Sequence, residues 1–269
     1  MLRFSANLSM LFQEYDFLDR FDAAARAGFE AVEYVSPYEY PADEIAVRLK
    51  RAGLEQALFN LPVGDWVAGE RGLAVLPDRI DEFRRSVDTA ARYAQALDCR
   101  QVNCLAGIGL KNTAPAELET VFVENLRYAA DRFGNAGIRL LIEPINDRID
   151  MPGFFLTGTR QALDIIDKVA SDNLFLQYDI YHMQIMEGDI ACTIEANLPR
   201  IGHIQVAGHP GRHEPDIGEI NYPFLFDHLD RIGYRGWVGA EYRPRGRTEE
   251  GLGWMSGFGG RAKEKSKAG

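Results

Sequence analysis

Oxygen-bearing side chains lie at or near the ends of four apolar runs in the C-terminal half of the sequence. They belong to Glu143, Asp179, Gln205 and Glu241. Each lies in an apolar context, where a lone charge would be costly to bury. Carboxylates brought close together repel one another, so such a site needs a cation or shared protons. This all-oxygen set favours Mg²⁺ or Mn²⁺ as the cation, whereas zinc recruits more nitrogen or sulfur ligands.

Short strand-like runs alternate with longer helical segments along the whole chain. The predicted strands are 2–8, 31–35, 56–61, 101–106, 139–145, 174–180, 201–207 and 237–242. The predicted helices are 16–27, 42–52, 77–97, 115–135, 159–169, 183–197, 222–232 and, last, a short one at 248–255. This alternation over about 250 residues predicts an α/β fold, a (β/α)₈ TIM barrel. An open doubly wound sheet is the alternative, although no GxGxxG motif follows the first strand.

In a TIM barrel the carboxyl ends of the strands form one face, and active sites lie there. The four oxygen-bearing residues belong to the last four predicted strands, so a barrel would bring them to that face. Any one of them alone has an ordinary alternative, as a solvated strand end or as the partner of a rim arginine. Four on consecutive strands predict a shared site.

Composition limits the classes of partner. Thirty Lys and Arg residues stand against 40 Asp and Glu, and the net charge of −10 argues against nucleic acid. The three cysteines form no CxxC pair, which favours a reduced, cytoplasmic setting. No apolar run approaches the roughly 20 residues of a membrane span. We expect one barrel domain over 1–256 and a disordered basic tail over 257–269. Barrel enzymes often associate, so a homo-oligomer is also considered, although no sequence feature identifies an interface.

Several stretches carry a resemblance to a known family. They read FSANLSMLF, NLPVGDWVAGERG, NCLAG, LIEPIN, LTGTRQAL, QYDIYHMQ, GEINY and GWVGAEY, and they run from about Leu2 to Met255. Together they resemble the hydroxypyruvate isomerase family, which belongs to the xylose-isomerase-like TIM barrels. The ketose 3-epimerases are more distant relatives, and they have a histidine where this chain has Gln205. That difference favours the isomerase branch.

The resemblance implies a divalent metal held by Glu143, Asp179, Gln205 and Glu241, with Glu143 and Glu241 as the acid/base pair. It implies the interconversion of hydroxypyruvate and tartronate semialdehyde (2-hydroxy-3-oxopropanoate) by metal-assisted proton transfer through an enediolate. Which glutamate removes the first proton is left open.

A three-carbon hydroxy-keto acid carries a carboxylate, so a cationic anchor is expected. Arg71, in a glycine-rich segment expected to cover the barrel mouth, and Arg212 are the candidates. His182 is predicted to donate to a substrate oxygen. Asn103 is expected to line the pocket or to cap the following helix. His203 is expected to point away from Gln205, towards the helices.

Other activities are also compatible with these residues. A 2-oxo-tetronate isomerase or a ketose 3-epimerase would use the same metal and the same glutamates. A second class is an endonuclease of a similar barrel type, which would need a histidine-rich zinc cluster and a basic surface. A third is a barrel that binds a sugar acid without catalysis.

Overall fold

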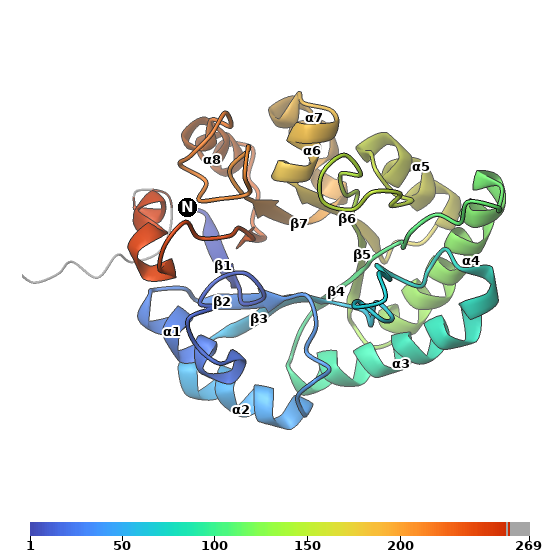
Figure 1. The fold of residues 1–269 in the computed structure, drawn as a ribbon, viewed down its shortest axis with the longest axis horizontal. Coiled ribbons are helices and arrows are strands. Elements are labelled where there is room, and N and C mark those ends of the chain that lie inside the picture. The colour runs from blue at the N-terminus through green and yellow to red at the C-terminus, as the bar shows by residue number, and fades with distance from the viewer. Residues whose placement is uncertain (257, 259–269) are drawn as a thin grey trace, which may run out of the picture.

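The computed structural model describes residues 1–256 and 258, and within them eight parallel strands close into a barrel (Figure 1). The strands, in chain order and in order around the barrel, are β1 (Arg3–Asn7), β2 (Ala31–Tyr34), β3 (Glu55–Asn60), β4 (Gln101–Cys104), β5 (Arg139–Ile142), β6 (Leu174–Asp179), β7 (Ile201–Val206) and β8 (Trp237–Ala240). The pairing of β1 with β8 closes the sheet, with Arg3 opposite Trp237. The predicted TIM barrel is confirmed, and the open sheet is wrong.

Helices surround the barrel (Figure 1). They are α1 (Arg20–Arg26), α2 (Ala42–Ala52), α3 (Ile80–Ala96), α4 (Pro115–Gly134), α5 (Thr159–Val169), α6 (Ile180–Met186), α7 (Ile190–Asn197) and α8 (Tyr222–Arg231). Short 3₁₀ helices are η1 (Phe17–Asp19), η2 (Pro77–Arg79), η3 (Leu198–Arg200) and η4 (Thr248–Met255). The tail expected from residue 257 onward lies outside the described residues, apart from Phe258.

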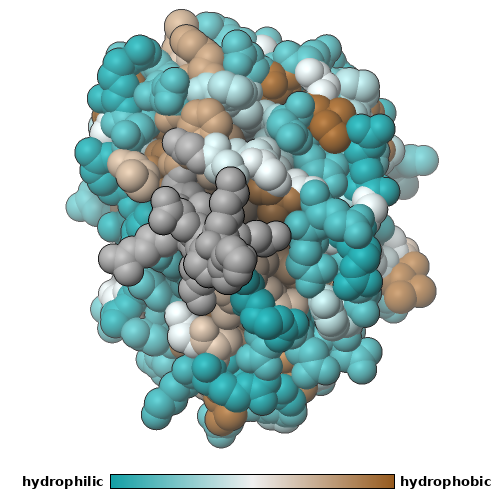
Figure 2. All heavy atoms as spheres, turned by 90° about the vertical axis from the view of Figure 1, so that its left-hand side faces the viewer, coloured by the Kyte–Doolittle hydropathy of each residue, from teal (hydrophilic) through white to brown (hydrophobic). Residues whose placement is uncertain are grey.

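The helices pack on the barrel through one apolar face. In α5 the buried residues Ala162, Ile165, Ile166 and Val169 recur at the spacing that places them on one side of a helix. The apolar core therefore fills the space between strands and helices. On the side of the molecule shown in Figure 2, hydrophilic side chains predominate and the apolar ones are dispersed. Among the described residues, no helix combines the length and the apolar character that a membrane crossing requires.

One predicted helix is wrong in its extent. The segment 183–197 was expected to be a single helix, but the structure divides it into α6 and α7. The first begins early because the Asp179 side chain accepts from backbone N–H groups at its start. It ends before Gly188, whose φ of +75° suits glycine and interrupts the helix. The break keeps α6 short and its first turn at the barrel mouth.

The segment 61–76, which follows β3, is anchored at its second half. Val75 N donates to Ala106 O at 3.0 Å in the loop after β4. Gly72 has a φ of +129°, and a Cβ at this position would overlap the backbone oxygen of Leu105. Only glycine allows the two loops to approach so closely. The segment is therefore fixed against the barrel at this end.

Candidate active site

A cavity of about 870 Å³ opens at the carboxyl ends of the strands. Among the predicted site residues, it is lined by Glu143, Gln205, Glu241, Arg71, His182 and Arg212. Asp179 and Asn103 are buried behind this lining and contact residues within it. The structure therefore brings the predicted residues together at one end of the barrel.

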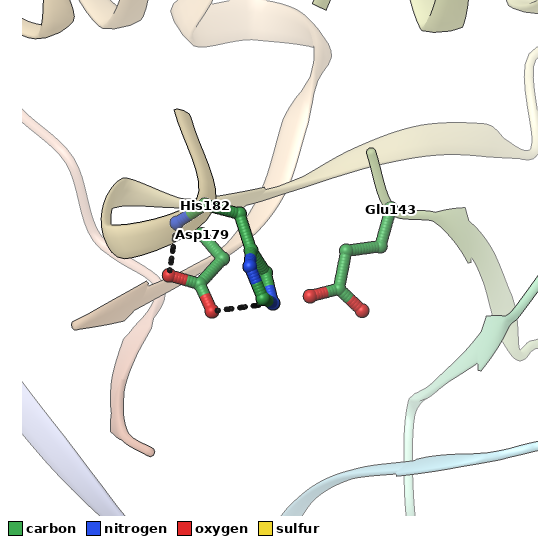
Figure 3. A group of neighbouring side chains, drawn as sticks. All are labelled: Glu143, Asp179 and His182. Atoms are coloured by element: carbon green, nitrogen blue, oxygen red, sulfur yellow. Dashed lines mark hydrogen bonds and ion pairs between the residues drawn. The ribbon is translucent and has the colours of Figure 1, made fainter. Parts of the chain in front are cut away.

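Glu143 directly follows β5, and its carboxyl group points towards Asp179 and His182 (Figure 3). One potential ligand atom from each of these residues lies within 4.8 Å of the other two. Asn103 Nδ2 donates to Glu143 Oε2 at 2.9 Å. Burial, reinforced by the negative charges of Glu241 and Asp179, raises the pKa of Glu143 well above its usual range. Glu143 is therefore held in place as a carboxyl group that retains its proton readily.

Asp179 ends β6 and uses its two oxygens differently. Oδ1 accepts hydrogen bonds from Tyr181 N at 2.8 Å and His182 N at 3.4 Å, at the start of α6. Oδ2 is buried and accepts no hydrogen bond from the part of the chain that the structure describes. His182 Nε2 lies 3.5 Å from it, the contact drawn in Figure 3, and Arg212 Nη2 lies 3.6 Å from it. A buried carboxylate oxygen with only these long contacts is costly, and a bound cation would satisfy it.

Glu241 follows β8 and is held by donors on both of its oxygens. Arg212 Nη2 donates to Oε1 at 2.7 Å, and Asn7 Nδ2 donates to Oε2 at 3.0 Å. Burial raises the pKa of Glu241 to about 8, although the Arg212 charge opposes the rise. Arg212 itself is buried, and its Nη1 donates to Asp150 Oδ1 at 3.1 Å. Both terminal nitrogens of Arg212 therefore already pair with carboxylates.

His182 is buried, and its environment selects one tautomer. Asn146 Oδ1 accepts from Ile149 N at 2.9 Å and Asp150 N at 3.0 Å, which directs the Asn146 amide nitrogen away from them. This nitrogen donates to His182 Nδ1 at 2.7 Å, so the neutral ring carries its proton on Nε2. Burial lowers the pKa of His182 to about 4. A protonated Nε2 has no free lone pair for a metal, so His182 is suited to donate a hydrogen bond.

Gln205 and His203 both point into the barrel. His203 Nε2 donates to Glu33 Oε2 at 2.9 Å, and Gln205 Nε2 donates to Glu33 Oε1 at 2.8 Å. The expectation that His203 faces the helices is wrong, because residues two apart on a strand share a face. Gln205 Nε2 also donates to Glu241, and Gln205 Oε1 accepts from Gln177 Nε2 at 2.6 Å. The Gln205 oxygen therefore lies towards β6.

Glu33 and Asp150 are site residues that the sequence analysis missed. Glu33 lies inside β2, and burial alone would raise its pKa. The His203 ring and hydrogen bonds from Ser5 and Gln205 outweigh burial and hold the pKa of Glu33 below its usual range. A lone charge within an apolar strand was a signal for a paired residue. Nothing in the local sequence marked Asp150, which comes from the long loop after β5.

Arg71 lies in the segment 61–76 at the mouth of the cavity. Its guanidinium carbon lies 3.7 Å from the centroid of the Trp66 ring, and its Nη1 donates to Trp66 O at 2.9 Å and Glu70 O at 2.7 Å. Glu70 in turn pairs with Arg79 at the start of the following helical segment. No carboxylate among the described residues pairs with Arg71, so its charge is available to a ligand.

The donor set fits a divalent cation. The buried, unpartnered Asp179 Oδ2 and the raised pKa values of Glu143 and Glu241 indicate more negative charge than Arg212 balances. Glu143 and Asp179 each offer a carboxylate oxygen within 4.8 Å of the other's, and carboxylate oxygens suit Mg²⁺ or Mn²⁺. Gln205 would complete the set through its oxygen.

After a chelator has removed divalent cations, the free energy of unfolding of the protein should fall as the pH rises from about 7 to about 8. Glu241 has a folded-state pKa of about 8 against 4.5 for an unperturbed group, so the folded state holds a proton that the unfolded state has lost. The contribution of this proton to the free energy of unfolding is complete below pH 4.5. It is lost as the pH rises to the folded-state pKa, by up to ~1.4 kcal/mol per pH unit for each proton. His182 is mostly neutral in both states in this window.

Chemical denaturation at several pH values measures this slope. Glu241→Gln removes this titrating group and should make the slope smaller, while Glu143, whose pKa is also raised, still contributes to it. An unchanged slope in this variant would assign the proton to another residue.

The chain matches the family described as xylose isomerase-like TIM barrel over residues 21–257. It is 53% identical to the hydroxypyruvate isomerase of Escherichia coli over 96% of this chain and 100% of that protein. It is 49% identical to the 2-oxo-tetronate isomerase of Cupriavidus necator over 97% of this chain and 100% of that protein. A crystal structure described as AP endonuclease, family 2, from Brucella melitensis matches with a TM-score of 0.93 and 50% identity, covering 95% of this chain and 98% of that one.

Proposed function

Because the chain belongs to the hydroxypyruvate isomerase family of xylose isomerase-like TIM barrels, we propose that it interconverts hydroxypyruvate and tartronate semialdehyde. The observation that carries the proposal is a pair of carboxyl groups with raised pKa values in one cavity, the buried Glu143 and the part-buried Glu241. Such groups can accept and return protons during catalysis. The reaction moves one proton between neighbouring carbons, so it needs an acceptor and a donor of this kind.

We propose that Glu143, Asp179, Gln205 and Glu241 hold Mg²⁺ or Mn²⁺. When bound, the cation would act as a Lewis acid that polarises the substrate carbonyl and stabilises the charge of the developing enediolate. Asp179 Oδ2 is buried and without a hydrogen-bond partner in the described chain, which supports its role as a ligand. Gln205 would contribute Oε1, which here accepts from Gln177.

The protein's own groups would move the protons. One of Glu143 and Glu241 accepts a proton from the substrate carbon, and the other returns a proton to the neighbouring carbon. The first glutamate then passes its proton to the oxygen that becomes the new hydroxyl, and the second takes the proton of the hydroxyl that becomes the carbonyl, so both return to their starting states. Asn103 donates to Glu143, and Arg212 and Asn7 donate to Glu241, so each carboxyl group keeps its position during the exchange. The order in which the two glutamates act is open.

Arg71 is the better candidate for the substrate carboxylate. Arg212 already donates to Asp150 and Glu241 through its two terminal nitrogens. Arg71 donates only to backbone oxygens of its own segment and lies at the cavity mouth. His182 would donate its Nε2 proton to a substrate oxygen, and Trp66 beneath Arg71 would shield the reactive intermediate from water.

Arg71→Ala should lose most of its efficiency on hydroxypyruvate. Breaking a charged hydrogen-bonded pair costs ~2–3 kcal/mol, on the order of 30- to 150-fold in kcat/KM. Arg71→Lys should recover only part of this, because an ammonium lacks the two-pronged geometry. Steady-state kinetics measure the effect, and melting temperatures show whether the fold is intact.

Arg100→Ala is a matched control, since Arg100 is exposed at the opposite end of the barrel, just before β4. It should behave as wild type. If Arg71→Ala also did so, the carboxylate would be held elsewhere, with Arg212 the next candidate.

A four-carbon substrate is the second candidate. It is favoured by the 49% identity to a 2-oxo-tetronate isomerase. An endonuclease activity, as named for the Brucella melitensis structure, fits less well, because DNA binding favours a basic surface and this chain carries a net charge of −10.

The direct test is isomerisation in D₂O followed by NMR. After loading with Mg²⁺ or Mn²⁺, the enzyme should exchange carbon-bound protons of hydroxypyruvate with solvent while forming tartronate semialdehyde. Parallel assays use a 2-oxo-tetronate and a free ketose. Faster turnover of the ketose would contradict the carboxylate-anchor argument, and binding without exchange would mean a non-catalytic protein. The cytoplasmic location and the homo-oligomer stay predictions.

A further inference from the structure

A buried carboxylate, that of Glu33, is held by donors from two strands, β1 and β7. Glu33 Oε2 accepts from Ser5 Oγ at 2.6 Å and from His203 Nε2 at 2.9 Å. Its Oε1 accepts from Gln205 Nε2 at 2.8 Å and from Asn7 Nδ2 at 3.4 Å. The side chain is only 1% exposed, so these groups replace water as its donors. None of the roles proposed above uses this carboxylate.

The structure makes room for Glu33 on the neighbouring strand. Gly239 of β8 lies opposite Gln205 in the strand register, and a Cβ at Gly239 would overlap both carboxylate oxygens of Glu33. The carboxylate is thus confined by the backbone of β8 as well as by its donors. Its position is set before any ligand enters the cavity.

An ionised carboxylate can only accept hydrogen bonds, and this fixes the orientation of the amide beside it. Glu33 can bond to the amide nitrogen of Gln205 but would repel the amide oxygen. The nitrogen therefore faces Glu33 and also donates to Glu241, and the oxygen faces the opposite side, where it accepts from Gln177 of β6. Asp179, which is also proposed as a cation ligand, lies on β6 and is the residue paired with Gln205 of β7 in the sheet.

We propose that Glu33 is a positioning residue that fixes the Gln205 amide with its oxygen towards β6, ready to bind a divalent cation. The proposal rests on the proposed function, in which Gln205 is a cation ligand. Residues that orient a metal ligand through a hydrogen bond commonly change metal affinity by 10- to 100-fold when replaced, on the order expected here.

Mn²⁺ binding measured by electron paramagnetic resonance tests the proposal without an activity assay. Glu33→Gln should weaken Mn²⁺ binding at least roughly tenfold, because the new amide no longer forces one orientation on Gln205. In a Gln205→Ala background the same change should weaken binding by less than about twofold, since the residue through which Glu33 acts is gone.

Ser5→Ala is the matched control. It removes one hydrogen bond to Glu33 but contacts neither Gln205 nor the cation site, so it should lower the melting temperature and leave Mn²⁺ affinity unchanged. If Glu33→Gln does not fold, Glu33→Asp draws the carboxylate back by one methylene and should give a smaller loss that again disappears in the Gln205→Ala background.

The outcomes separate the two proposals. Wild-type protein that binds no Mn²⁺ would overturn the cation site and the role of Glu33 together. If wild type binds Mn²⁺ but the Glu33 variants bind it equally well, only the role of Glu33 is overturned. An equal loss with and without Gln205 would mean that Glu33 acts through its charge alone, which also overturns the proposal.

Discussion

Glutamine at position 143 or at position 241 is expected to lower the turnover of hydroxypyruvate by at least roughly 10²-fold. Glutamine keeps an oxygen that can touch a cation, but it cannot carry the proton. Both wild-type side chains are carboxyl groups whose pKa values are raised by removal from water, so each holds a proton more readily than a free carboxyl group. Steady-state kinetics and solvent deuterium exchange measure the loss.

The turnover of the double variant shows whether the two glutamates act together or independently. Glu143→Gln combined with Glu241→Gln should be little slower than the slower single variant, because the residues act as a unit. Mn²⁺ binding by each variant serves as the control for the site. A single variant with near-normal turnover would show that its glutamate is a ligand only.

Removal of divalent cations by a chelator is expected to abolish turnover, and Mg²⁺ or Mn²⁺ should restore it. The physical reason is that the negative charges of Glu143, Asp179 and Glu241 act on one another and need more than the Arg212 cation to balance them. Full activity in protein shown by elemental analysis to be metal-free would end the cation proposal.

The variant Asp179→Asn tests whether the cation site needs the negative charge of Asp179. Asparagine can still accept the hydrogen bonds from Tyr181 N and His182 N that begin α6, but it removes the negative charge. Mn²⁺ affinity should fall while the melting temperature changes little. Asp179→Ala should lower both, because it also removes the cap. A variant with asparagine that bound Mn²⁺ as tightly as wild type would exclude Asp179 as a charged ligand.

The barrel could be predicted from the sequence because its signal is repeated along the whole chain. Each strand-like run is short, apolar and followed by a helix, so small errors at element ends do not change the topology. The prediction of a single helix at 183–197 was wrong for a local reason. Its apolar pattern continues across Gly188, but the backbone there takes a left-handed conformation that no hydrophobic spacing reveals.

The residues proposed as cation ligands could be predicted because parallel strands bring their carboxyl ends to one face. The detailed partners could not. Glu33 and His203 are 170 positions apart in sequence and meet only because β2 and β7 both face the barrel interior. Asp150 meets Arg212 across two loops. Contacts of this kind depend on side-chain directions inside a closed barrel, which a single sequence does not specify.

The burial of His182 changes how a pH–rate profile of this enzyme should be interpreted. An apparent pKa near neutrality in such a profile is commonly assigned to a histidine. Here burial lowers the pKa of the site's histidine to about 4, while it raises the pKa of Glu241 to about 8. A kinetic transition near neutrality would therefore not report His182, and in the cation-free protein the group that titrates on the alkaline side is a carboxylic acid. Chemical modification of histidine, the usual way to identify such a group, would point to the wrong side chain.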